Sequence, residues 1–226
     1  GLCLDNLDIL CVYGNMSMEL RNNIEREEFD YQVLMSALSG YASPRDKVTA
    51  LLRKGIIIRV KKGLYVFGRE YRRNPYCREL LANLIYGPSY VSLEYALSYY
   101  GMIPERVEAV TSVTTGRARS YDTPIGRYIY RSTPQFSMGI DRAGSDACSF
   151  LIAVPERALA DRLRDDRGGS GRTLKSMSEY MFANLRLDED LVRGLNSDFM
   201  EDLAVALRSR KVKICADVIR RLGRRR

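Results

Sequence analysis

The sequence contains no histidine. This excludes serine–histidine and cysteine–histidine catalysis and removes the usual ligand of hydrolytic zinc sites. The five cysteines are scattered, odd in number and without a CxxC pair, which argues against structural zinc and against a disulfide framework. We therefore expect reduced cysteines, no metal and no cofactor. They are Cys3, Cys11, Cys77, Cys148 and Cys215.

Long hydrophobic runs are also missing. No stretch approaches about 18 uninterrupted apolar residues, so no membrane span is predicted. Residues 1–15 are mildly apolar but acidic and contain no basic n-region, so they make a poor signal peptide. They are either sequence foreign to the natural protein or a short structured arm. We expect a cytoplasmic protein with no membrane partner.

Positive charge, in contrast, is concentrated in one segment. Residues 41–75 contain ten Lys and Arg residues against Asp46 and Glu70, a net charge of +8 that equals that of the whole chain. The other residues balance at 26 positive and 26 negative, by subtraction from 36 and 28. A charge distribution of this kind predicts a surface that meets a polyanion. The alternative is the solvated face of a small module.

The charged segment begins with a clear helix signal. Ser43 suits the N-cap and Pro44 suits the first helical position. The helix should end at Gly55, a residue that readily adopts the left-handed conformation. Three apolar side chains fall at positions i, i+3 and i+4 and should face inward. They are Val48, Leu51 and Leu52.

A hairpin signal follows the helix. Two short apolar runs flank Lys62-Gly63, which predicts two strands and a turn. Asp30 is expected to cap a helix that precedes both elements. Helix, turn, helix and basic hairpin is the order of a winged helix-turn-helix domain, which we predict over residues 16–74. Within the first strand, an apolar face should alternate with a charged face. The predicted faces are Ile56, Ile58 and Val60, and Ile57, Arg59 and Lys61.

The rest of the chain predicts a larger mixed domain over residues 75–222, so the fold class is α+β with a helical C-terminus. Strands are expected at 107–115, 126–133, 136–140 and 147–154. In these segments apolar and polar residues alternate, or a short run of residues is apolar throughout. A helix is expected from Pro155. Residues 223–226 form a basic tail that is either solvated or in contact with phosphate.

Motifs that would suggest catalysis have simpler explanations. The loop GGSG at 168–171 lacks the lysine of a P-loop and follows a helix, so it reads as a flexible connection. The acidic run 188–190 stands where a helix would begin, and acidic residues favour that end. Asp161, Asp165 and Asp166 read as a solvated helix edge. We therefore expect no enzyme and no catalytic residues.

The tyrosines near the start of the larger domain permit two readings. Core packing with hydroxyl groups at the rim is one. A partner-binding surface is the other, because tyrosine is enriched in interface hot spots. They are Tyr86, Tyr90, Tyr95, Tyr99 and Tyr100.

The charged helix and hairpin predict contact with double-stranded DNA. In a winged helix the second helix enters the major groove and its first residues reach base edges, whereas hairpin cations neutralise phosphates. The unpaired N–H groups near Ser43 can also donate to phosphate. The candidate residues are Ser43, Arg45, Lys47, Thr49 and Arg53 on the helix, and Arg59, Lys61 and Lys62 on the hairpin.

Three blocks of sequence resemble the abortive-infection AbiEi antitoxin family. They are ALLRKGIIIRVKKGLYVF, YVSLEYALSYYGMIPE and FLIAVPERALADRL, and the resemblance covers roughly residues 24–165. It implies a promoter-binding antitoxin that represses its own operon through inverted repeats. It also implies a C-terminal domain that counteracts a cognate nucleotidyltransferase-type toxin. The groove-facing residues carried over are Ser43, Arg45, Lys47 and Thr49, with Arg59, Lys61 and Lys62 on the wing.

Two other functions stay open from the sequence. One is a stand-alone winged-helix regulator whose C-terminal domain senses a small ligand. The other is a nucleic-acid-processing enzyme that uses the acidic residues with a metal.

Overall fold

The computed structural model describes residues 18–168 and 171–224 of the chain. The predictions for residues 1–15, for the middle of the GGSG loop and for the last two residues of the basic tail fall outside this range. The chain divides into two compact units. The first ends at Cys77 and includes Thr123–Ile125, and the second consists of Arg78–Asp122 and Gly126–Arg226.

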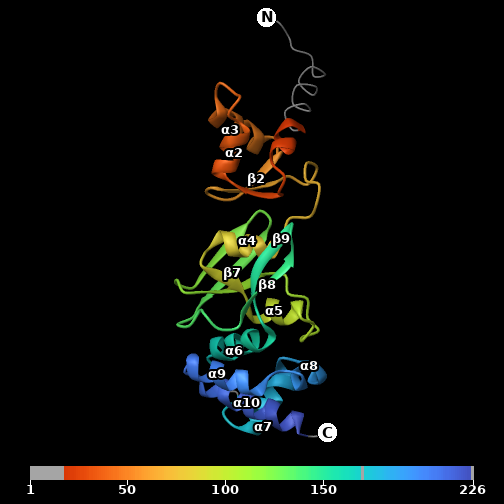
Figure 1. Cartoon of the computed structure of the whole chain (residues 1–226), viewed down its shortest axis with the longest axis vertical. Coiled ribbons are helices and arrows are strands. Elements are labelled where there is room, and N and C mark those ends of the chain that lie inside the picture. The colour runs from red at the N-terminus through yellow and green to blue at the C-terminus, as the bar shows by residue number, and fades with distance from the viewer. Residues whose placement is uncertain (1–17, 169–170, 225–226) are drawn as a thin grey trace, which may run out of the picture. The chain divides into compact units, whose positions relative to one another are not determined.

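The first unit combines short helices with a three-stranded antiparallel sheet of order β1-β3-β2 (Figure 1). A helix over residues 18–23 comes first along the chain. The elements that follow are β1 (Glu28–Asp30), α2 (Tyr31–Ala37), α3 (Pro44–Arg53), β2 (Ile57–Lys61) and β3 (Leu64–Phe67).

Local signals explain these boundaries. The Asp30 carboxylate accepts a hydrogen bond from the Val33 N–H at 2.8 Å, so Asp30 is the N-cap of α2, as predicted. Pro44 starts α3 after Ser43, whose side chain makes no capping hydrogen bond. Gly55 follows the last turn of α3 with a φ of +68°, which confirms the predicted left-handed residue.

The core of the first unit lies between α2, α3 and the sheet. Leu34 and Leu51 have no exposed surface, and Val48 on the same face of α3 is 8% exposed. The inward face of α3 is therefore confirmed, with Leu52 half-buried at its edge. The buried cluster consists of Leu20, Ile24, Phe29, Leu34, Leu38, Val48, Leu51, Ile56, Ile57, Tyr65 and Phe67.

The predicted alternation along β2 is wrong in part. Ile57 was assigned to the charged face, yet it is 1% exposed, and Ile58 on the apolar face is half-exposed. Ile57 is buried because it belongs to the core cluster of the first unit, together with Ile56. The register departs from regular pairing only further along β2. Arg59 pairs with Tyr65 and Lys61 pairs with Leu64, so one extra residue stands between them on β2. Such a bulge interrupts the alternation of side chains between the two faces.

A buried ion pair stabilises the start of the first unit. Arg21 donates to the Glu27 carboxylate at 2.6 Å, and both side chains are 7% exposed. The same carboxylate oxygen accepts hydrogen bonds from the backbone N–H groups of Arg73 and Asn74. Because buried charges need partners, Arg21 and Glu27 depend on each other and fix the segment that follows β3.

The second unit contains a six-stranded mixed sheet of order β6-β7-β5-β4-β9-β8 (Figure 1). The pairs β4–β9 and β5–β7 are parallel, whereas β4–β5 and β8–β9 are antiparallel. The strands are β4 (Ser89–Val91), β5 (Val110–Thr114), β6 (Arg119–Thr123), β7 (Gly126–Ser132), β8 (Ile140–Ser145) and β9 (Cys148–Ala153). The strand predicted over 136–140 is wrong, because β8 begins only at Ile140, and β6 was not predicted.

Helices pack on this sheet and form the C-terminal part of the second unit. Helix α4 packs on β9, and α5 packs on β5 and against α6. The α+β fold class and the helical C-terminus are therefore confirmed. The helices are α4 (Arg78–Ile85), α5 (Leu93–Tyr99), α6 (Pro155–Asp165), α7 (Leu174–Glu179), the π-helical turn η1 (Tyr180–Asn184), α8 (Glu189–Arg193), α9 (Ser197–Ala206) and α10 (Arg210–Gly223).

Polar side chains cross the interior of the second unit. Asp161 is 4% exposed and binds Arg157, which is fully buried, at 3.0 Å. The hydroxyls of Tyr90 and Ser92 donate to the other carboxylate oxygen of Asp161 at 2.9 and 2.8 Å. The prediction of a solvated edge is therefore wrong for Asp161. Its neighbour Asp165 pairs with a partly exposed arginine at the surface.

Candidate nucleic-acid interface

The exposed side of α3 carries a strip of polar residues. Arg45, Thr49 and Arg53 are all exposed and follow one another at intervals of four residues. Residues at this spacing lie on one face of a helix, one turn apart. The Thr49 hydroxyl donates to the Arg45 carbonyl at 3.3 Å, which holds it against the helix backbone. Ser43 is exposed at the N-terminal end of the helix.

Lys47 lies on another side of α3. It is two positions from Arg45, so its side chain points away from the exposed strip. The side chain is half-buried, and its ammonium lies 4.8 Å from the centroid of the Tyr41 ring. Such a cation–π contact attracts the ammonium to the ring face and restricts the reach of the side chain. The structure thus brings Arg45, Thr49 and Arg53 together and separates Lys47 from them.

The three hairpin cations differ in exposure. Arg59 and Lys62 are exposed, whereas Lys61 is half-buried. Partial burial lowers the pKa of Lys61 below the usual value for lysine. The bulge between Arg59 and Lys61 also separates their side chains, which simple alternation would place on one face.

Most of the predicted cations have their charge available for a ligand. Among residues 18–168 and 171–224, no carboxylate lies within 4.0 Å of Arg45, Arg53, Arg59 or Lys62. Asp46 is the acidic neighbour on the same helix and is itself exposed. Arginine and lysine without an internal partner can each neutralise a phosphate at little cost in lost ion pairs.

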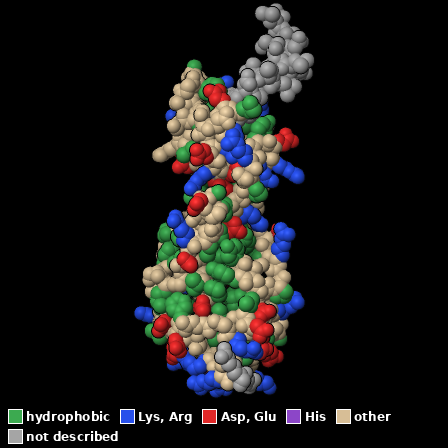
Figure 2. Space-filling view, turned by 45° about the vertical axis from the view of Figure 1, so that its right-hand side comes forward, with side chains coloured by type: hydrophobic (Ala, Val, Ile, Leu, Met, Phe, Trp, Pro, Cys, Tyr) green, Lys and Arg blue, Asp and Glu red, His purple; other side chains and the backbone are tan. Residues whose placement is uncertain are grey.

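A second basic region was missed in the sequence. Residues 207–226 contain nine Lys and Arg residues against Asp217 alone, a net charge of +8. The residues outside 41–75 have a net charge of zero when they are summed together, and this sum conceals the segment. Net charge calculated in short successive windows along the sequence would have found it. Figure 2 shows Lys and Arg side chains gathered near the C-terminal end of the second unit. Arg210, Lys213 and Arg221 of α10 are exposed.

A cavity of about 530 Å³ lies beside the first turn of α10. Lys211 donates to the Asp166 carboxylate at 3.1 Å and to two backbone carbonyls, so its charge is partly compensated. The other charged residues that line the cavity are arginines. The residues that line the cavity are Asp166, Arg167, Gly168, Gly171, Arg172, Arg210, Lys211 and Ile214.

The tyrosine group divides between core and surface. Tyr90 is fully buried, Tyr86, Tyr95 and Tyr100 are half-buried, and Tyr99 is 48% exposed. Burial raises the pKa of Tyr100 to about 12, so its hydroxyl stays neutral at physiological pH. Core packing explains Tyr90. The partner-surface reading stays a prediction that applies mainly to Tyr99.

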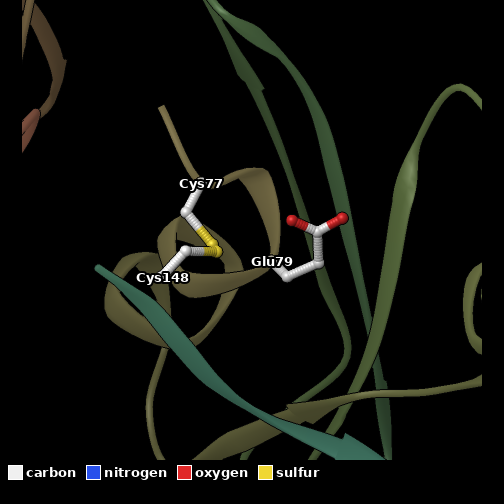
Figure 3. A group of neighbouring side chains, drawn as sticks. All are labelled: Cys77, Glu79 and Cys148. Carbon is white, nitrogen blue, oxygen red and sulfur yellow. The ribbon is translucent and has the colours of Figure 1, made fainter. Parts of the chain in front are cut away.

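The cysteines depart from the sequence prediction. Cys77 and Cys148 are disulfide-bonded, and Figure 3 draws their sulfur atoms next to each other beside the Glu79 side chain. The expectation of reduced cysteines is therefore wrong for this pair. No motif in the sequence marks either cysteine as a disulfide residue. Cys215 is free and buried, which raises the pKa of its thiol.

The acidic run that might have suggested a metal has a structural role. The Asp188 carboxylate accepts a hydrogen bond from the Leu191 N–H at 2.9 Å and caps α8, and Glu189 and Asp190 lie in the first turn of that helix. Both also pair with Arg193. The predicted helix start is confirmed.

The chain matches no protein-family model, and no curated protein matches its sequence. The resemblance to the AbiEi family therefore stays a prediction. Within residues 18–168 and 171–224, no helix has the length and apolar character that crossing a bilayer requires.

Proposed function

We propose that the protein is a DNA-binding transcriptional repressor that acts as the antitoxin of a toxin–antitoxin operon. The observation that supports DNA binding is an exposed cationic strip on α3 together with a cationic hairpin. Both belong to a unit whose helices and strands follow one another in a particular order along the chain. That order is helix, β1, α2, α3, β2 and β3, with the sheet arranged β1-β3-β2. It is the order expected of a winged helix-turn-helix domain.

In this proposal α3 enters the major groove. Arg45 lies in the first turn, where a recognition helix reaches base edges, and its guanidinium can donate two hydrogen bonds to guanine. Arg53, two turns later, is suited to a phosphate. Ser43 marks the helix end whose free N–H groups can donate to phosphate oxygens.

The hairpin supplies sequence-independent affinity. Arg59 and Lys62 are exposed cations and neutralise backbone phosphates, which releases condensed counterions. Lys61, half-buried and with a lowered pKa, contributes less than the other two. With about five to seven phosphates neutralised, the logarithm of affinity falls by about 0.9 per contact for each tenfold rise in salt.

The antitoxin role depends on the sequence resemblance. The resemblance assigns repression of the shared promoter to the first unit. It assigns to the second unit the neutralisation of a nucleotidyltransferase-type toxin, encoded by a gene beside the gene of this protein. Inverted repeats in that promoter would bind two molecules.

A second candidate is a stand-alone regulator whose second unit senses a small ligand. The cavity beside α10 favours it, because Arg167, Arg172 and Arg210 border a space of ligand size. A phosphorylated metabolite suits this lining. This candidate predicts that such a metabolite changes DNA affinity and that no toxin gene lies next to this one.

A mobility-shift titration tests the proposal. The full chain is titrated onto duplex DNA from upstream of its own gene and onto a shuffled duplex of equal composition, at several salt concentrations. Tighter binding to the native duplex is expected, with affinity that falls steeply as salt rises. Equal affinity for both duplexes contradicts a repressor. Adding the neighbouring gene product to a toxicity assay then tests the antitoxin role separately.

A further inference from the structure

The cavity beside the first turn of α10 lies within the second unit and has a volume of about 530 Å³. Three segments line it: the loop after α6, the loop before α7 and the start of α10. Helix α10 packs on both α6 and α7, which brings these segments together (Figure 1). A space of this size is typical of sites that bind small molecules.

Each of the three segments contributes one arginine to the lining. Arg167 follows α6, Arg172 precedes α7 and Arg210 begins α10, and all three are exposed. In the part of the chain that the structure describes, their guanidinium groups make no hydrogen bond and have no carboxylate within 4.0 Å. Guanidinium groups match the oxygen atoms of phosphate with paired hydrogen bonds, so three arginines around one cavity favour a phosphate ligand.

Lys211 connects two sides of the cavity. Its ammonium donates to the Asp166 carboxylate at 3.1 Å and to the backbone carbonyls of Asp166 and Gly168 at 2.6 and 2.7 Å. These bonds hold the loop after α6 against α10. They also neutralise Asp166, the one acid among the described lining residues. Four cations and one acid leave the lining with a net charge of +3.

The first turn of α10 increases this excess of positive charge. It contains Arg210 and Lys211 and no acidic residue. The N-terminal end of a helix carries a partial positive charge, so cations are unfavourable there and an anion is favourable. An anionic ligand in the cavity would stabilise both the helix end and the arginines around it.

We propose that this cavity binds the diphosphate group of a small ligand, either a nucleoside diphosphate or inorganic pyrophosphate. A single phosphate monoester carries about −1.5 to −2 charges at pH 7, which is less than the lining can neutralise. A second phosphate group brings the charge of the ligand close to that of the lining. The inference deepens the second candidate function, because it names the ligand, and it does not depend on DNA binding.

Isothermal titration calorimetry of the full chain tests the proposal with ADP, pyrophosphate, AMP and adenosine, at fixed ionic strength and without DNA or Mg²⁺. We expect ADP and pyrophosphate to bind at one site per chain. AMP should bind at least about tenfold more weakly, because a charged group with its hydrogen bonds is lost, and adenosine should not bind. Tighter binding of ADP than of pyrophosphate identifies an ester as the ligand, and equal binding identifies the diphosphate alone. No binding of either, or equal affinity for AMP and ADP, overturns the proposal.

Variants locate the site. Arg172→Gln and Arg210→Gln should each weaken diphosphate binding at least about tenfold. Lys213→Gln is the matched control, because Lys213 is exposed on the same helix, lies outside the lining and carries the same charge. Salt screens such a distant charge, so this variant should weaken binding less than about threefold. Thermal unfolding confirms that each variant is folded. Equal losses in Arg210→Gln and Lys213→Gln would show diffuse attraction and overturn the site.

Discussion

Arg157 is a single residue on which the interior of the second unit depends. It is fully buried, and its guanidinium donates to the Asp161 carboxylate, the Thr133 hydroxyl and the carbonyls of Gln135 and Met138. Arg157→Ala leaves the Asp161 carboxylate buried without its charge partner. We therefore expect the free energy of unfolding to fall by about 3–5 kcal/mol, measured by urea denaturation of the full chain.

Arg193 provides the matched control. It also pairs with acids on its own helix, Glu189 and Asp190, but its side chain is 40% exposed. Because water screens exposed pairs, Arg193→Ala should lower the free energy of unfolding by less than about 1 kcal/mol. Similar losses in the two variants would contradict the structural role assigned to Arg157.

Asp161 also illustrates what the sequence cannot reveal at this scale. Within PERALADRLRDD it has the spacing of a solvated acid on an amphipathic helix. The groups that make its burial possible, the hydroxyls of Tyr90 and Ser92, lie about 70 residues earlier in the chain, in and after β4. Only the parallel pairing of β4 with β9, which leads into α6, brings them together.

Arg45 should determine sequence preference in the proposed interface. Arg45→Ala is expected to weaken binding to the native duplex by about 1–3 kcal/mol and binding to the shuffled duplex by less, because a contact with a base edge is lost. Arg53→Ala, on the same strip of α3, should weaken binding to both duplexes equally. A mobility-shift titration at fixed salt measures both. If Arg45→Ala behaves like Arg53→Ala, Arg45 contacts only phosphate.

At the scale of elements, the β2–β3 hairpin should set much of the salt dependence. Replacing Arg59 and Lys62 together with alanine should reduce the slope of log affinity against log salt by about 1.8, about 0.9 for each lost phosphate contact. Lys61→Ala is the matched control and should change the slope less, because Lys61 is half-buried. A slope unchanged in the double variant would exclude the hairpin from the interface.

Some helices and strands can be predicted from local sequence signals, and others cannot. Helix α3 carries Ser43-Pro44 at its start and Gly55 after its end, and both signals are local. Strand β8 has the sequence IDRAGS and is the edge strand of its sheet. It buries little surface, so it lacks the alternation that identifies half-buried strands, and its pairing with β9 alone defines it.

At the scale of the whole molecule, charge is distributed in two basic regions and not one. Residues 41–75 and 207–226 each carry a net charge of +8, so the other residues together carry −8. The sequence prediction found the first region because helix and hairpin signals coincide there. It missed the second because acids elsewhere cancelled it in the sum. Composition alone therefore predicts that the protein binds a polyanion. It does not predict which of the two basic regions makes the contact.

Composition does predict how binding should respond to pH. Histidine is the side chain whose ordinary pKa lies between about pH 5 and 8, and the chain has none. DNA affinity should therefore change less than about twofold between about pH 6 and 8 at constant ionic strength. Above that range Lys61, whose pKa burial lowers, begins to lose its proton, and affinity should begin to fall. Lys61→Ala should delay this fall. Mobility-shift titrations across the range measure it, and a large change below pH 8 would mean that a group outside the proposed interface controls binding.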